Sequence, residues 1–269
     1  MTYKEGLKMA QIVQSGHMAI GHAADIALGG MCAWRLPTDA SCASVARSLL
    51  GLAMTTLGLD RDKVDDATLA VSELATNALH HGLNAGPETP TAPPELWLWA
   101  RATPTPQLVL TVFDACRSSW PDTTPRGLLD DHGRGIGIVA MLAEAWGAHP
   151  TRSICTQGVP GKAVWSAFAL PDPWSNTRTT APPMLAARHL VAMLTARGVT
   201  NVTHRHGKGV SLVTIPLGGN EETNIWIEPG HLSYTTPTGT RHRRPMIDLH
   251  DATETLVQAQ ERITAPNLF

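Results

Sequence analysis

The stretch Leu69–Gly82, LAVSELATNALHHG, carries the main structural signal of this chain, because it combines helical periodicity with well-spaced polar residues. Apolar residues recur every three or four positions from Asp62 to His81, which predicts an amphipathic helix. Glu73 and Asn77 are four residues apart, so they project from the same face of that helix. A carboxylate beside an amide oxygen suits Mg²⁺, which prefers oxygen ligands. The same spacing also fits an ordinary solvated helix face, and the spacing by itself leaves both interpretations open.

The segments around this helix alternate between strand-like and helical patterns. In chain order the sequence predicts a strand at Met31–Leu36, a helix capped by Thr38 or Asp39 and ended by Gly58, strands at Glu95–Ala100 and Gln107–Asp114, a glycine-rich helix start at Gly133–Gly137, and a strand at Lys162–Leu170. Helices followed by antiparallel strands predict an α+β fold, a two-layer sandwich of helices on one face of a mixed, mainly antiparallel sheet.

Proline-rich segments divide the chain, because each proline removes a backbone donor and restricts the residue before it. The segment 171–183 has the composition of an interdomain linker. The predicted parts are an N-terminal extension at 1–30, a first domain at 31–170, the linker, and a small α-β-β-β-α module at 184–269. Three or four short strands are expected in this second small α/β module.

Composition narrows the function classes. The net charge of −2 over 269 residues gives no general attraction to nucleic acid, which is therefore disfavoured as a partner. No apolar run approaches the roughly 18–20 residues of a membrane helix. The first thirty residues lack the hydrophobic centre of a signal peptide, so we expect a cytoplasmic protein without membrane contact. The four cysteines form no C-x-x-C pair, so neither a zinc knuckle nor a disulfide framework is indicated.

The run Gly133–Gly137 directly precedes an apolar helical pattern. Glycines there let the backbone approach a ligand, and the free amides of a helix start attract phosphate oxygens. A dinucleotide-binding turn would need a strand immediately before the glycines, whereas here a polar loop, Ala115–His132, comes first. Asp114 ends a strand, where its carboxylate is placed either to accept hydrogen bonds from a purine amine or to open a turn.

Several of these segments occur in a shared order. LAVSELATNALHHG is followed by VFD ending at Asp114, by GRGIGIV at Gly133–Val139, and by GKAVW at Gly161–Trp165. Over Cys32–Leu170 the chain resembles the actinobacterial relatives of anti-sigma-factor serine kinases, within the superfamily of histidine kinases, gyrase B, the Hsp90 chaperone and MutL. The resemblance implies a Bergerat-type ATP-binding fold with ATP and Mg²⁺ as ligands.

The resemblance also implies roles for individual residues. Glu73 matches the catalytic base, Asn77 the magnesium ligand, and Asp114 the aspartate that contacts the adenine amine. His81, rather than His80, occupies the position of the family's histidine before the glycine. The phosphate-binding positions fall at Gly133, Arg134, Gly135 and Gly137. The flexible lid over the nucleotide falls at Ala115–His132.

The chain departs from the superfamily's pattern in two places. Cys116 and Ser118 stand where glycines usually follow the aspartate, and the threonine expected on the last strand has no clear equivalent near Lys162. By the resemblance, bulk at Cys116 narrows the adenine pocket, and loss of the threonine removes a hydrogen bond to the ring or its waters.

Two functions follow from these observations. The first is an ATP-dependent serine/threonine protein kinase, in which Glu73 takes the proton of a partner's hydroxyl while Mg²⁺ on Asn77 and the glycine-loop amides stabilise the transferring phosphoryl group. The alternative is a non-catalytic protein-binding module with a degenerate nucleotide site. Either would control transcription through a sigma factor or an anti-sigma antagonist. A homodimer is left open.

A third, weaker interpretation concerns the C-terminal region. His204-Arg205-His206 and Arg241-His242-Arg243-Arg244 suggest a metal or nucleic-acid role. Two histidines at i and i+2 share a strand face, yet no cysteine follows them, and the neutral charge balance disfavours DNA.

Overall fold

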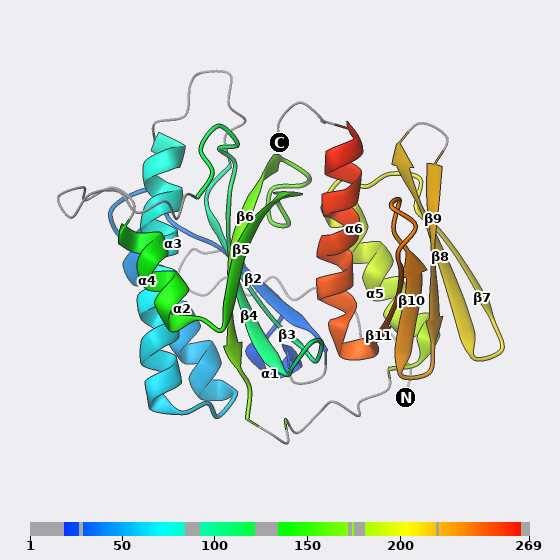
Figure 1. Cartoon of the computed structure of the whole chain (residues 1–269), viewed down its shortest axis with the longest axis horizontal. Coiled ribbons are helices and arrows are strands. Elements are labelled where there is room, and N and C mark those ends of the chain that lie inside the picture. The colour runs from blue at the N-terminus through cyan, green and yellow to red at the C-terminus, as the bar shows by residue number, and fades with distance from the viewer. Residues whose placement is uncertain are drawn as a thin grey trace.

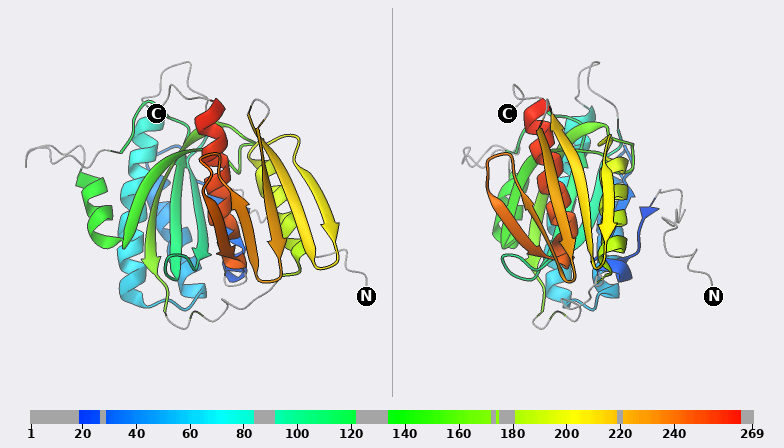
Figure 2. Two further views of the ribbon diagram at one scale, coloured as in Figure 1. Left: turned by 45° about the vertical axis from the view of Figure 1, so that its right-hand side comes forward. Right: turned by 90° about the vertical axis from the view of Figure 1, so that its right-hand side faces the viewer.

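The computed structural model describes residues 19–26, 29–83, 92–121, 134–171, 174, 181–218 and 221–264. These residues form two antiparallel sheets with helices packed in four layers (Figure 1). The layers run from the helices α2, α3 and α4, through a six-stranded sheet and the helices α5 and α6, to a five-stranded sheet, and Figure 2 shows the same stack from two other sides.

The six-stranded sheet has the order β1-β2-β3-β4-β6-β5. Every neighbouring pair in it is antiparallel. The bounds of its strands are β1 (Ala19–Ile20), β2 (Met31–Arg35), β3 (Glu95–Arg101), β4 (Gln107–Asp114), β5 (Ala145–Arg152) and β6 (Pro160–Ala169). The predicted α+β class is confirmed, and the sheet is antiparallel throughout the described residues rather than mixed.

One face of this sheet is covered by α2 (Cys42–Thr56), α3 (Arg61–Leu83) and α4 (Arg134–Leu142). Side chains alternate across a strand, so every second residue of β4 joins the core beneath these helices. That core includes Leu108, Leu110 and Val112 of β4, together with Leu50, Leu74 and Val139 of the helices. The same alternation places Asp114 on the helix side of the sheet, at the end of β4.

The C-terminal module begins with α5 (Pro183–Ala196) and ends with the short 3-10 helix η1 (Met246–Asp248) and α6 (Leu249–Thr264). Between them lies a five-stranded sheet of order β11-β10-β9-β8-β7. Its strands are β7 (Thr203–Gly207), β8 (Val210–Gly218), β9 (Glu221–Glu228), β10 (His231–Thr235) and β11 (Arg241–Pro245). Helix α6 contacts β5 on one side and β8 on the other, so the module shares its helices with the first sheet (Figure 1).

The sequence prediction undercounted the strands of both sheets. The module has five strands where three or four were expected, and β1 and β5 of the first sheet were not predicted. The missed strands β1, β5, β7 and β11 all lie at a sheet edge. β1 has only two residues. The sequences of β5, β7 and β11 (AWGAHPTR, THRHG and RHRRP) are rich in glycine, proline or charge, which edge strands tolerate and which protects them from pairing with other chains.

The N-terminal boundary predicted at residue 30 cuts through the first sheet. β1 pairs with β2, and Ile26 of the short helix α1 (Ala23–Ile26) is fully buried in the first core. Within the linker predicted at 171–183, Trp174 is buried in the same core. The first layered unit therefore includes residues on both sides of the predicted limits.

Two neutral histidines inside the interface between α5 and α6 should make the fold sensitive to mild acid. The His189 and His250 rings pack edge to face with centroids 5.0 Å apart. Burial, helped by His189 and Arg197, holds the pKa of His250 well below its usual value, and burial lowers the pKa of His189. As pH falls below about 6.5, the two histidines are therefore protonated in the unfolded chain before they are protonated in the folded protein.

We expect the free energy of unfolding to fall between pH 7.5 and pH 5.5, with each histidine contributing at most about 1.4 kcal/mol per pH unit. Urea titrations at several pH values measure this slope. The variant His250→Asn should unfold with a smaller pH slope, whereas His206→Asn, which changes an exposed histidine of β7, should keep the slope of the parent protein. An unchanged slope in His250→Asn would contradict the assignment.

Candidate functional site

Glu73 and Asn77 lie on the side of α3 that faces the beginning of α4. A Cβ atom built on Gly135 would lie 2.7 Å from Glu73 Oε2 and 3.4 Å from Asn77 Nδ2. A side chain at position 135 would therefore displace the Glu73 carboxylate from its present position, whereas glycine permits this close approach. The helical spacing placed the acid and the amide on one face, and the packing of α3 on α4 brings them to the glycine-rich segment.

Helix α4 begins at Arg134, inside the predicted glycine-rich run. The amides of its first turn have no acceptor within the helix, and such amides attract phosphate oxygens. Gly137 is exposed, and a Cβ atom built on it would meet nothing within 4 Å. Gly133 and the side chain of Arg134 lie outside the described residues, so their predicted contacts with phosphate stay predictions.

Asp114 lies directly opposite Lys162 across the β4–β6 pair. The Lys162 ammonium is 2.6 Å from Asp114 Oδ2, and the two side chains are 2% and 5% exposed, respectively. The backbone amide of Cys116 donates to Asp114 Oδ1 at 2.7 Å, and Lys162 also donates to the Cys116 carbonyl. Burial raises the pKa of Asp114, although Lys162 and the Cys116 amide oppose that shift. The carboxylate predicted to meet a purine amine is thus already paired.

His81, near the C-terminal end of α3, is half-buried beside this pair. Its Nε2 atom lies 3.5 Å from the Ser119 hydroxyl. Burial lowers the pKa of His81, and the positive charge of Lys162 lowers it further, while Asp114 acts in the opposite direction. The structure therefore brings together His81, Asp114 and the first part of the predicted lid.

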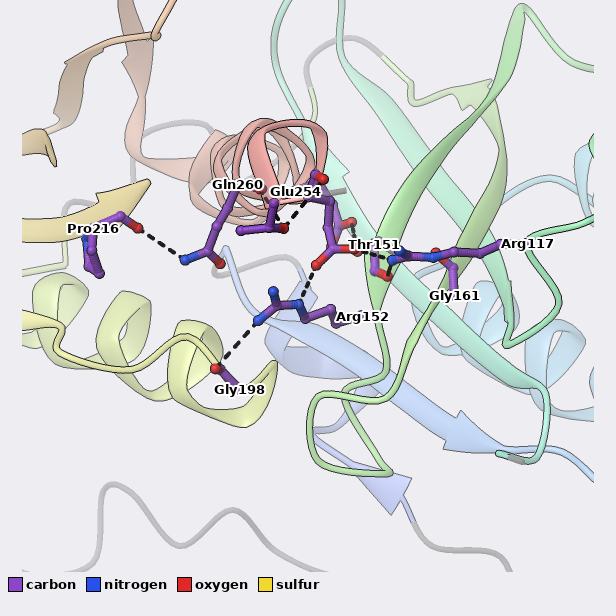
Figure 3. Close-up of polar contacts among 10 residues, drawn as sticks. Arg117, Thr151, Arg152, Gly161, Gly198, Pro216, Glu254 and Gln260 are labelled. Carbon is purple, nitrogen blue, oxygen red and sulfur yellow. Dashed lines mark hydrogen bonds and ion pairs between the residues drawn. The ribbon is translucent and has the colours of Figure 1, made fainter. Parts of the chain in front are cut away.

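The described part of that lid, 115–121, is held at Arg117. Its guanidinium donates to the Gly161 carbonyl at 2.9 Å and to the Thr151 carbonyl at 2.8 Å, and it forms an ion pair with Glu261 of α6 (Figure 3). This contact links the C-terminal module to the segment that follows Asp114. Nothing in the local sequence around Arg117 predicted it, because its partners are far away in the chain. The rest of the lid, 122–132, lies outside the described residues.

A second ion cluster joins α6 to the first sheet beside Arg117. Glu254 pairs with Arg197, the residue that follows α5. The Oε2 atom of Glu254 lies 3.1 Å from His149 Nε2 and 3.0 Å from Thr151 Oγ1. Burial alone would raise the pKa of Glu254, but Arg197, His149 and Thr151 together hold it below its usual value. Arg152 pairs with Glu261, and Figure 3 shows Thr151 and Arg152 of β5 beside Glu254 of α6.

The arrangement fits the two ends of a metal-bound nucleotide differently. At the end formed by α3 and α4, a carboxylate and an amide lie beside the first turn of α4, whose amides have no acceptor within the helix, and this set suits Mg²⁺ and phosphate oxygens. At the end formed by β4 and β6, the Asp114 carboxylate is paired with a buried ammonium. The residues present therefore fit the phosphates and their metal, and they do not fit a purine amine as they stand.

Two features of the C-terminal module lie apart from this site. A cavity of about 550 Å³ is lined by residues of the second sheet, among them Glu222, Trp226, Tyr234 and Arg241. On β7, the His204 and His206 rings are 6.0 Å apart. Among the described residues, no group of three or more His, Cys, Asp or Glu side chains could hold a metal ion. The role in nucleic-acid binding stays a disfavoured prediction.

Within the described parts of the chain, no helix is both long and apolar enough to cross a membrane. A comparison with curated proteins found no match. Residues 36–154 match the family model of the histidine kinase-like ATPase domain. This match includes Glu73, Asn77, Asp114 and Gly135, and it ends before Lys162. Over these residues the chain is therefore similar to the histidine kinase-like ATPase domain.

Proposed function

We propose that this chain is a cytoplasmic ATP-binding regulatory protein that phosphorylates or sequesters a partner protein to control transcription, as the anti-sigma-factor serine/threonine kinases do. The observation that carries the proposal is the approach of Gly135 to Glu73 and Asn77. It supports the proposal because an acid, an amide and a helix start then lie close together, as a base, a metal ligand and a phosphate-binding segment would have to. A sigma factor or an anti-sigma antagonist is the proposed partner.

Bound Mg²⁺-ATP supplies the phosphoryl group in this proposal. Asn77 would provide an oxygen ligand to the metal, and the first-turn amides of α4 would hold phosphate oxygens. Glu73 accepts the proton of a serine or threonine hydroxyl on the partner. Because these groups lie on two packed helices rather than on loops, their positions are held by the core beneath them.

Calorimetry with Mg²⁺-ATP and with ATP in the presence of a chelator tests this proposal. We expect the parent protein to bind more tightly when Mg²⁺ is present. Asn77→Ala should lose that advantage, weakening Mg²⁺-ATP binding by roughly tenfold or more, since even indirect partners of a metal ligand change affinity that much. Thr76→Ala is the matched control, because the Thr76 hydroxyl donates to the Ser72 carbonyl of its own helix. Equal binding by Asn77→Ala would refute the assigned role.

A second candidate function is a non-catalytic protein-binding module with a degenerate nucleotide site. The pairing of Asp114 with Lys162 favours it, because this pair takes the carboxylate predicted to contact the base. If Mg²⁺-ATP produces no heat while a sigma factor or antagonist still co-purifies with the protein, this second function replaces the first.

A further inference from the structure

Lys162 is an unusual residue for the place it holds. Its side chain is 2% exposed, on the helix side of the first sheet, and a lysine is rarely buried without a partner. β4 and β6 place it in direct register with Asp114, so the ammonium reaches the carboxylate at 2.6 Å. The next residue, Ala163, faces the opposite side and packs in the core near α5. Of the residues of β6, Lys162 is therefore the one whose register places its side chain beside Asp114.

The donors and acceptors of this pair decide what a ligand would meet there. An ionised carboxylate can only accept hydrogen bonds, and those of Asp114 come from Lys162 and the Cys116 amide. An ammonium can only donate, as the amino group of a base does. A base that offers an amino group therefore finds its acceptor already bound to a full positive charge in a buried setting.

We propose that Lys162 is an internal substitute for the base amine at Asp114, so that the site does not select 6-amino purines over 6-oxo purines. The inference rests on the proposed nucleotide site and assigns its base specificity. Of the three N–H bonds of Lys162, two are directed to Asp114 and the Cys116 carbonyl. An ammonium has no lone pair, so a base atom that approaches Lys162 meets only donors, which suits a base oxygen rather than a base amine.

The experiment compares Mg²⁺-ATP with Mg²⁺-ITP, which carries a 6-oxo group where ATP carries the 6-amino group. Affinities are measured by calorimetry for the parent protein, for Lys162→Thr and for Lys63→Thr. The last is a matched control, because Lys63 is a partly buried lysine of α3 that donates to the Ala169 carbonyl at the other end of β6. Circular dichroism confirms that each variant is folded.

We expect the parent protein and Lys63→Thr to bind both nucleotides within about threefold of each other, or to favour ITP. Lys162→Thr frees the carboxylate and should favour ATP by roughly tenfold or more, the range of one hydrogen bond to a charged group. A parent protein that already favours ATP tenfold overturns the inference while the proposed function stands. If Lys162→Thr and the parent protein have the same ratio of ATP to ITP affinity, the inference is overturned as well.

Two further outcomes separate the inference from the proposed function. If the parent binds neither nucleotide and Lys162→Thr binds ATP, Lys162 is confirmed as the substitute and the proposed function fails for the natural chain. If neither the parent protein nor Lys162→Thr binds either nucleotide, both the inference and the proposed function fail. Should Lys162→Thr not fold, the ratio of the two affinities in the parent protein decides the inference.

Discussion

Replacing Glu254 with alanine should lower the free energy of unfolding by about 3–5 kcal/mol, because the buried Arg197 guanidinium then loses its charged partner. Arg197 is 1% exposed and pairs with Glu254, which is itself 6% exposed. Its guanidinium also stacks over the Trp97 ring at 5.1 Å, so it cannot turn into water without disturbing the first sheet. Urea or thermal unfolding measures the loss, with an expected decrease in Tm of roughly 6–20 °C.

Two further variants separate an unpaired buried charge from a general loss of packing. Arg197→Met combined with Glu254→Leu removes both charges and should recover most of the loss, since buried ion pairs replaced by apolar residues are often neutral in stability. Glu228 lies on β9, is 48% exposed and pairs with His231. Glu228→Ala should therefore lower the free energy of unfolding by less than about 1 kcal/mol. A loss in Glu254→Ala as small as in Glu228→Ala would show that the cluster does not hold α6 on the first sheet.

Replacing Glu73 with glutamine should reduce phosphoryl transfer to the partner about 100- to 10,000-fold under the proposed function, the range that a general base contributes. Glutamine keeps the shape of the side chain beside Gly135 but cannot accept the hydroxyl proton. Binding of Mg²⁺-ATP should change little, because Asn77 and the amides of α4 remain. Transfer of label from ATP to the candidate sigma factor or antagonist measures the rate.

Asp66→Asn is the control for this experiment. Asp66 is an exposed acid on the same helix, two turns before Glu73, so its replacement should leave the rate of transfer unchanged. Equal labelling of the partner by Glu73→Gln and the parent protein would remove Glu73 from the mechanism. It would leave the packing of Gly135 on α3 unaffected, because that contact is a property of the fold.

The contact between Arg117 and Glu261 connects the two halves of the molecule next to the site. Arg117 follows Asp114 by three residues, and Glu261 belongs to α6, which is packed against the second sheet. Gln260, beside Glu261, donates to the Pro216 carbonyl of β8 at 3.0 Å (Figure 3). The C-terminal module is therefore attached to the segment that the sequence predicts as the lid.

Local sequence patterns were sufficient to predict the long helix α3 and the central strands of the first sheet. The apolar period of Leu69–Gly82 predicted α3, and the same period put Glu73 and Asn77 on one face, because helical spacing is a property of neighbouring residues. The strands that became β2, β3, β4 and β6 were also predicted from local sequence, because each is a short run rich in apolar, aromatic or β-branched residues. The edge strands β5, β7 and β11 were missed because their glycine, proline and charged residues hide the strand pattern.

The sequence by itself determined the α+β class, the long helix with its acid and amide, and the glycine-rich helix start. Only the tertiary structure decided that α5 and α6 lie between two sheets, that Arg117 reaches Glu261, and that Lys162 meets Asp114. Each of these contacts joins residues far apart in the chain. Which residues meet depends on strand register and helix packing, and one position of slip between β4 and β6 would turn Lys162 to the opposite face.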